Sequence, residues 1–258
     1  MNENNKFEVV LKKAISLKAT NINREAFLRK ELMKAVGNSQ VVEKAILTNP
    51  AQAGIDVTTI NIIADECINY QTTLVTGLSA AAGIPGGPAV LATIPADTIQ
   101  YFAHILIITQ KLAYLYGWDE FIDSNNQIDD ATNNLLTLFI GVMFGVSEAS
   151  KQLIKLSSLI ASNTSKKLMQ KTLTKTTVYN VSKKVAKIIG VKLTKQTFSR
   201  GVGKIIPVVG GILSGALTYA SYKPMAKKLK KHLSQLDRCN VYYYRNHNIQ
   251  NSPEVIDI

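Results

Sequence analysis

The sequence lacks acidic residues over a long stretch of its second half. Between residues 149 and 236 there is no Asp or Glu, whereas the same stretch contains 17 lysines and Arg200. Residues 1–150 carry 15 acidic and 10 basic side chains, and the rest of the chain carries 3 acidic and 20 basic ones. Charge distribution bears on solubility and partners rather than on topology. The imbalance therefore predicts that the C-terminal half meets an anionic partner.

Cysteine is also scarce. Cys67 and Cys239 lie far apart in the sequence, so a disulfide framework is not expected and a reducing cytoplasm fits the composition. Cys67 falls on the apolar face of an expected helix, where we predict a small buried hydrophobic residue. The first residues are polar and lack the apolar core of a signal peptide, so none is expected. Apolar residues make up 46% of the chain, which excludes wholesale disorder.

Apolar residues recur at helical spacing through nearly the whole chain, and no segment alternates for long enough to predict a strand. The predicted helices cover residues 7–18, 22–36, 39–48, 57–82, 95–116, 129–143, 148–161, 164–188 and 210–236. Polar residues are expected at their starts, namely Asn21 or Asn23, Ser39, Asp56 and Asp129. Gly37 and Gly117 are expected at helix ends. The sequence predicts an all-α, multi-helix bundle with a long central helix, a Gly/Pro-rich turn at 83–88 and a basic C-terminal half.

The long central helix carries two stripes at helical spacing. Its apolar stripe, which we expect to be buried, consists of Ile60, Ile63, Cys67, Tyr70, Leu74 and Leu78. Its polar stripe, which we expect to face solvent, consists of Thr58, Asn61, Asp65, Asn69, Thr72 and Thr76.

The segment 49–54, Asn-Pro-Ala-Gln-Ala-Gly, interrupts the helical pattern and is the best internal boundary. We predict an N-terminal helical appendage at 1–50, a main helical domain at 51–238 and a C-terminal tail at 239–258.

Four segments contain no charged residue, namely 67–96, 98–110, 131–147 and 205–222. A membrane-spanning helix needs about 20 predominantly apolar residues, and 205–222 comes nearest. Gly210, Gly211 and Gly215 give it the spacing of small residues that lets helices approach closely. Lysines flank the segment on both sides, which does not suit a simple span. A shallow hairpin, an interfacial helix or a buried core helix fits better.

The basic side chains consist of 25 Lys and only 5 Arg. Base-specific recognition relies on the Arg fork, whereas Lys acts as a point charge suited to attraction without sequence readout. We therefore predict contact with an anionic membrane surface through the basic residues Lys192, Lys195, Arg200, Lys204, Lys223, Lys227, Lys228, Lys230 and Lys231. Nucleic acid is the second choice, because Tyr242, Tyr243, Tyr244 and Arg245 form an aromatic and basic cluster able to stack on bases.

Asp97, Tyr101 and His104 share one face of the predicted 95–116 helix, so a carboxylate, a phenol and an imidazole could perform acid–base chemistry there. The competing interpretation is a helix cap followed by a polar stripe, which we favour because no nucleophile accompanies the three residues. The histidines do not share metal-ligand spacing with either cysteine. Neither a metal nor a cofactor is predicted.

Two segments together resemble the bacterial EcsC protein family. The first is Ile94-Pro-Ala-Asp97 with the following helix up to Tyr116-Gly-Trp-Asp119, and the second is Gly190-Val-Lys-Leu-Thr-Lys195 with Ile206-Pro-Val-Val-Gly-Gly-Ile-Leu-Ser-Gly215. The resemblance covers roughly residues 76–235. It implies a helical, membrane-associated cytoplasmic protein, and it supplies no agreed catalytic residues.

These observations predict a non-enzymatic helical protein on the cytoplasmic face of the bacterial membrane. The alternatives are a module that binds nucleic acid or another protein, and a lipid-related enzyme that uses the face of Asp97, Tyr101 and His104.

Overall fold

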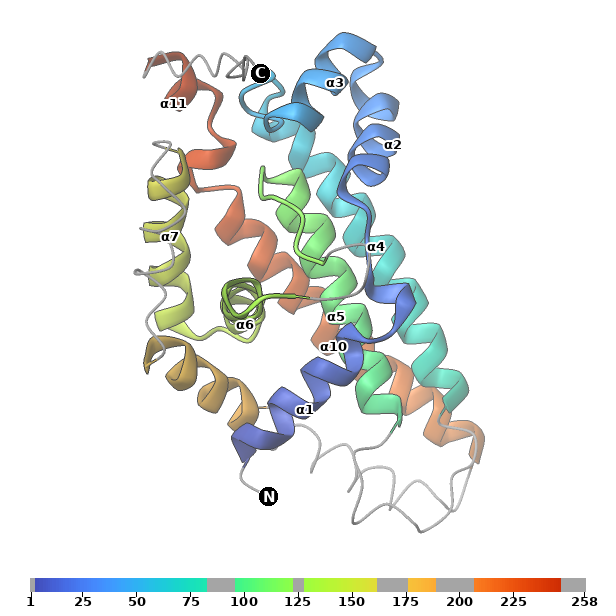
Figure 1. Ribbon diagram of the computed structural model, residues 1–258. Helices are drawn as coiled ribbons and strands as arrows, with labels where there is room; N and C mark the ends of the chain where they lie inside the picture. The colour runs from blue at the N-terminus through green and yellow to red at the C-terminus, as the bar shows by residue number, and fades with distance from the viewer. Residues whose placement is uncertain (1–2, 83–95, 123–127, 162–175, 189–206, 247–258) are drawn as a thin grey trace.

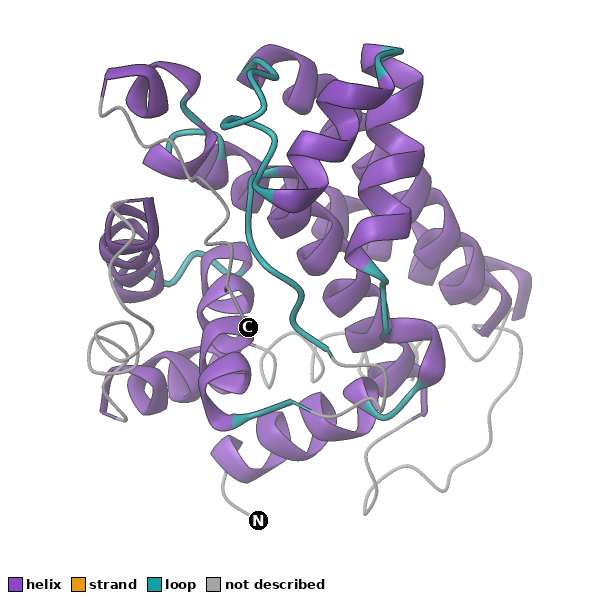
Figure 2. Ribbon diagram, turned by 45° about the horizontal axis from the view of Figure 1, so that its top comes forward, coloured by secondary structure: helices purple, strands orange, loops and turns teal. Residues whose placement is uncertain are grey.

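The computed structural model describes residues 3–82, 96–122, 128–161, 176–188 and 207–246. Throughout these ranges the regular structure is helical and no strand occurs, which confirms the predicted all-α class (Figure 1 and Figure 2). The helices are α1 (Glu3–Ile15), α2 (Arg24–Val36), α3 (Ser39–Leu47), α4 (Val57–Ala82), α5 (Ala96–Leu115), α6 (Asp130–Met143), α7 (Ser147–Ala161), a helix over 176–188, α10 (Pro207–Leu233) and α11 (Val241–Asn246). Two short 3-10 turns, η1 (Lys18–Thr20) and η3 (Asp237–Cys239), complete the order.

Three long helices form the middle of the molecule. α4 and α10 run antiparallel, and α5 packs against both (Figure 1). Lys230 on α10 donates a hydrogen bond to Oδ2 of Asp65 on α4 at 2.6 Å. Tyr222 on α10 donates its hydroxyl to the carbonyl oxygen of His104 on α5 at 2.8 Å. As a result, the last turns of α4 and the first turns of α5 and α10 lie at the same end of the molecule, at the lower right of Figure 1.

We call this the low-charge end, because the described parts of three uncharged segments, 67–82, 98–110 and 207–222, meet there. Asp97, in the first turn of α5, is the one charged residue in or between the first two of these segments. Nothing in the sequence indicates that the uncharged parts of α4 and α10, which are distant in the chain, lie together. The antiparallel packing of α4 and α10 places them together.

The remaining helices surround this trio. α1 packs on α5 and buries Phe7 and Leu11 in the same apolar core as the central helices. α6 packs against α5, α7 and α10. At Gly141, a Cβ atom would lie 2.6 Å from Val181 of the 176–188 helix and 2.7 Å from Ala149 of α7. The absence of a side chain there allows three helices to meet closely.

The helix ends follow the residues that local chemistry favours. Asn23 accepts a hydrogen bond from the backbone N–H of Ala26 at 2.7 Å, and Asp129 accepts one from that of Thr132 at 2.7 Å. Gly37 follows α2 with φ of 65°, a left-handed conformation that glycine adopts without strain. The prediction that Ser39 caps the third helix is wrong. Asn38 does so by accepting from Val41 at 3.2 Å, because an Asn directly before the helix already provides the carbonyl acceptor.

The predicted stripes of α4 are correct only over the first part of the helix. Ile60, Ile63 and Cys67 are buried as expected. Further along, the expected apolar side chains are exposed, with exposed fractions of 62% for Tyr70, 39% for Leu74 and 41% for Leu78. Conversely, Thr72 of the polar stripe is buried, together with Ile68, Gln71 and Val75.

The position of α2, which covers only part of α4, explains why the expected apolar face of α4 is exposed from Tyr70 onward. α2 packs against α4 near Cys67, whose surroundings include Glu31 and Lys34 of α2. In Figure 1 α2 lies beside the upper part of α4 and does not extend along its lower part. The same face of α4 is therefore covered near Cys67 and left open from Tyr70 onward. The side chains facing α5 and α10 are buried there instead.

The opposite end of α5 is held by two arginines that are distant in sequence. Arg238 is buried, with 5% of its surface exposed, and its Nε donates to the carbonyl oxygen of Gly117 at 2.9 Å. Arg24 donates from Nε to the carbonyl oxygen of Trp118 at 3.0 Å and from Nη1 to that of Ile46 at 2.8 Å. Positive charge at the C-terminal end of a helix is favourable, because the helix dipole is negative there.

Candidate functional site

Tyr101 and His104, two of the three residues weighed for acid–base chemistry, make contacts between helices. The hydroxyl of Tyr101 lies 3.4 Å from Oγ of Ser221 on α10. Nδ1 of His104 lies 2.8 Å from Nε2 of Gln71, a buried residue of α4. Burial raises the pKa of Tyr101 and lowers the pKa of His104. A neutral imidazole accepting a hydrogen bond from Gln71 accounts for His104 as a packing residue.

The third member, Asp97, lies in the first turn of α5, and its side chain falls outside the described part of the structure. The described contacts therefore bring Tyr101 and His104 together with α4 and α10. The hydroxyl that they place beside this pair is that of Ser221, next to Tyr101.

The lysines predicted on α10 divide into two groups. Lys227, Lys228 and Lys231 are exposed. Lys230 points toward α4, where its ion pair with Asp65 leaves 17% of its side chain exposed. Lys230 therefore contributes to packing, and the exposed face of α10 is the part available to an anionic partner.

Lys223 also lies on the α4 side by helical spacing and has a local partner. Its Nζ lies 3.3 Å from the hydroxyl of Tyr219 and 5.3 Å from the centre of that ring.

The other predicted basic residues, Lys192, Lys195, Arg200 and Lys204, lie outside the described residues. Gly210, Gly211 and Gly215 fall within α10, but in the stretch whose side-chain surroundings are not described.

The aromatic cluster proposed for base stacking is only partly at the surface. Tyr244 is buried, and its hydroxyl lies 3.2 Å from Nδ2 of Asn49. Tyr242 is 69% exposed, and the guanidinium of Arg245 lies 5.9 Å from the centre of its ring. One exposed tyrosine with one arginine is a smaller platform than the sequence indicated.

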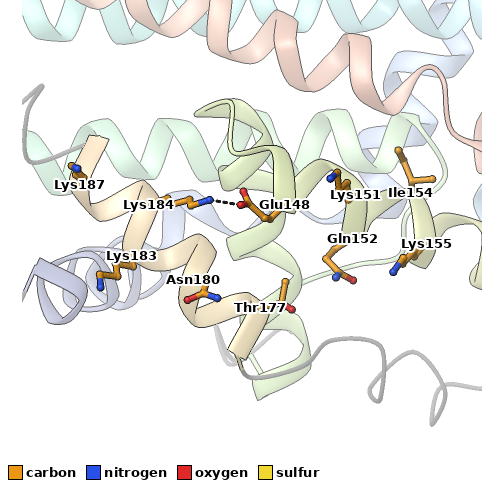
Figure 3. A pocket seen from close by; sticks show the side chains of 10 residues that line it. All are labelled: Glu148, Lys151, Gln152, Ile154, Lys155, Thr177, Asn180, Lys183, Lys184 and Lys187. Carbon is orange, nitrogen blue, oxygen red and sulfur yellow. Dashed lines mark hydrogen bonds and ion pairs between the residues drawn. The ribbon is translucent and has the colours of Figure 1, made fainter.

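A basic groove lies between α7 and the 176–188 helix (Figure 3). It has a volume of about 730 Å³. We call it the lysine groove after the five lysines in its lining, namely Lys151, Lys155, Lys183, Lys184 and Lys187. Glu148 is the one acidic residue in the lining and forms an ion pair with Lys184.

Sequence reasoning missed the lysine groove. The five lysines all belong to the acid-free stretch, which was the available signal. The groove itself depends on residues of α7 and of the 176–188 helix lining the same space, and no local pattern indicates that they do.

The low-charge end presents apolar side chains to solvent. Tyr70, Leu74 and Leu78 follow one another at four-residue spacing along α4, and Tyr219 of α10 is 49% exposed. We call Tyr70, Leu74 and Leu78 the exposed stripe. Lys111 lies 5.8 Å from the centre of the Tyr70 ring. Tyr70 and Tyr219 each therefore have a lysine ammonium within cation–π distance.

Within the described residues, no helix combines the length and apolar character needed to cross a bilayer. The same residues contain no group of three or more His, Cys, Asp or Glu side chains arranged to hold a metal ion.

Comparison of the chain with protein-family models, with curated proteins and with solved structures found no match. The resemblance to the EcsC family stays a prediction.

Proposed function

We propose that this protein is a non-enzymatic, peripheral membrane protein that docks on the anionic cytoplasmic face of a bacterial membrane. The low-charge end enters the interfacial region of the bilayer, and exposed lysines contact the headgroups. Membership of the EcsC family is part of the same proposal, and it is based on the motifs at 94–119 and 190–215.

The exposed stripe is the observation that carries the proposal. Leu74 and Leu78 project from the low-charge end into solvent, in a segment of α4 without any charged residue. Apolar patches on a protein surface mark sites of interaction with proteins or membranes. Tyrosine with an apolar ring and a polar hydroxyl is enriched at membrane interfaces, and lysine extends its ammonium toward the headgroups. Tyr70 with Lys111, and Tyr219 with Lys223, suit this boundary.

The magnitudes favour reversible docking. Complete burial of a leucine side chain contributes about 1.5–3 kcal/mol. Since Leu74 and Leu78 are each exposed by about two fifths, their transfer out of water contributes roughly 2 kcal/mol together. Lys111 and Lys223, which stand beside Tyr70 and Tyr219, add about 1 kcal/mol each where they face anionic lipid. A total of roughly 4 kcal/mol corresponds to a dissociation constant of about 1 mM.

The packing of Tyr101 and His104 supports a role without catalysis. Both are engaged with neighbouring helices, and burial disfavours their charged forms. An acid–base pair has to be free to exchange protons with a substrate, whereas the polar atoms of these two side chains are in contact with Ser221 and Gln71.

Vesicle flotation tests the proposal. The purified chain is expected to float with phosphatidylcholine vesicles that contain phosphatidylglycerol, and to float poorly with phosphatidylcholine alone or at high salt. The double variant Leu74→Gln/Leu78→Gln is expected to bind roughly 30-fold more weakly, the equivalent of about 2 kcal/mol.

Leu47→Gln is the matched control. Leu47 is 83% exposed at the end of α3, remote from the low-charge end in Figure 1. The Leu47→Gln variant should bind the anionic vesicles like the unaltered chain. Absence of flotation with anionic vesicles at low salt would refute the proposal, and so would equal binding by the double variant and the control.

A further inference from the structure

We propose that the lysine groove is a specific site for a small phosphate ester that carries at least two negative charges. This inference goes beyond membrane docking and is independent of it, because the groove lies on other helices than the exposed stripe. The ligand is recognised by its phosphate groups, whether it is a soluble molecule or the headgroup of a lipid.

The walls of the groove supply an excess of positive charge from both sides. Lys151 and Lys155 come from α7, and Lys183 and Lys187 come from the 176–188 helix (Figure 3). Within the described residues, none of these four lysines has a carboxylate partner. Four ammonium groups around one space repel one another, and a multiply charged anion relieves that repulsion.

The remaining lining gives the groove features beyond charge. Oε1 of Gln152 is buried without a hydrogen-bond partner, and Gln152 lies in the groove lining with Asn180. Ile154 adds an apolar contact. The volume of about 730 Å³ lies within the range of small-molecule sites.

Glu148 competes with the ligand for Lys184. Its carboxylate is paired with Lys184, between the lysines of the 176–188 helix and those of α7 (Figure 3). The hydrogen bond from Lys184 lowers the pKa of Glu148 to about 2, so the carboxylate is ionised at neutral pH. A phosphate group that reaches Lys184 has to displace Glu148. Removal of this negative charge is therefore expected to tighten binding.

The composition of the groove indicates phosphate rather than a nucleic-acid base. Its basic residues are all lysines, and its lining contains neither an arginine nor an aromatic ring. Lysine binds phosphate as a point charge, whereas single-stranded nucleic acid is bound largely by stacking on aromatic side chains.

Titration calorimetry with pyrophosphate tests the site. Saturable binding with one site per chain is expected, and Lys183→Ala/Lys187→Ala should weaken it at least tenfold. Lys227→Ala/Lys231→Ala removes the same charge from the exposed face of α10 and should change the affinity much less. No saturable binding, or equal losses for the two double variants, would overturn the proposal.

Glu148→Gln provides a test that does not depend on losing a function. It should raise the affinity for pyrophosphate roughly fourfold for each charge on the ligand near Lys184, the effect of one unit charge at about 5 Å in water. Glu66→Gln is the matched control, because Glu66 is exposed on α4 and distant from the groove. Equal gains for the two variants would show a general charge effect and refute the role of Glu148.

Two further arms identify the source of the phosphate. If vesicles containing phosphatidic acid compete with pyrophosphate, the ligand is a lipid headgroup; if they do not, it is a soluble phosphate ester. Preferential displacement of pyrophosphate by a single-stranded oligonucleotide would instead overturn the proposal. The flotation of Leu74→Gln/Leu78→Gln is measured separately with phosphatidylglycerol, so failure of one proposal leaves the other intact.

Discussion

Replacement of Arg238 by methionine is expected to destabilise the protein by roughly 2–3 kcal/mol. The substitution keeps most of the aliphatic volume but removes the guanidinium. In the folded protein that guanidinium donates from Nε to the carbonyl oxygen of Gly117 at 2.9 Å, and Nη2 donates to the same oxygen. It also lies 5.2 Å from the centre of the Trp118 ring. Methionine supplies neither interaction.

The expected loss of stability combines two stabilising interactions of the guanidinium and one cost of burying it. A hydrogen bond from a charged donor contributes about 1.5–3 kcal/mol, and an unsatisfied buried carbonyl costs about 1–3 kcal/mol. The desolvated cation–π contact with Trp118 contributes up to about 2 kcal/mol. Against these, methionine avoids the cost of burying a charge, a cost that also lowers the pKa of Arg238. The loss of the hydrogen bonds and of the cation–π contact outweighs the avoided cost of burying the charge, because the carbonyl of Gly117 remains buried without its donor.

The assay is urea denaturation followed by the fluorescence of Trp118, the single tryptophan of the chain. Arg238→Lys keeps a positive charge but loses the planar fork, and should fall between the methionine variant and the unaltered chain. Arg245→Met is the matched control. Arg245 is exposed beside the ring of Tyr242, so its loss should change stability by less than about 0.5 kcal/mol. An Arg238→Met protein as stable as the control would refute the reasoning and show that desolvation of the guanidinium dominates.

Two further predictions concern helix packing and pH. Gly141→Ala places a Cβ 2.6 Å from Val181, so the overpacking cost of about 1–3 kcal/mol outweighs the gain in helix propensity of about 1 kcal/mol. Gly77→Ala, with open space around it in α4, should show only the gain, and equal urea midpoints for the two variants would contradict this. Burial lowers the pKa of His104 and His232 below 6.5, so the unfolded chain binds more protons at mildly acidic pH and the free energy of unfolding falls as pH decreases through 6.5. His104→Gln should show a shallower decrease in urea denaturation at several pH values, and an unchanged slope would exclude His104 as a contributor.

The sequence by itself predicted the described helices before α11 and most of their ends, because these depend on neighbouring residues. α11 lies in the part predicted as a C-terminal tail. Apolar spacing marked α4, and Asn23 and Asp129 begin their helices by accepting the backbone hydrogen bonds that their side chains favour. The charge imbalance between the two halves was equally visible, since it requires only counting.

The surface available to partners was decided by the tertiary structure. The apolar face of α4 is continuous in sequence, yet α2 covers it near Cys67 and leaves it exposed from Tyr70 onward. Lys230 looks like its neighbours in the sequence, yet it is paired with Asp65, which lies 165 residues away. The lysine groove exists only because α7 and the 176–188 helix, which are separated in the sequence, line the same space. Helical periodicity is a local property, whereas burial and charge pairing depend on which distant helix packs against each face.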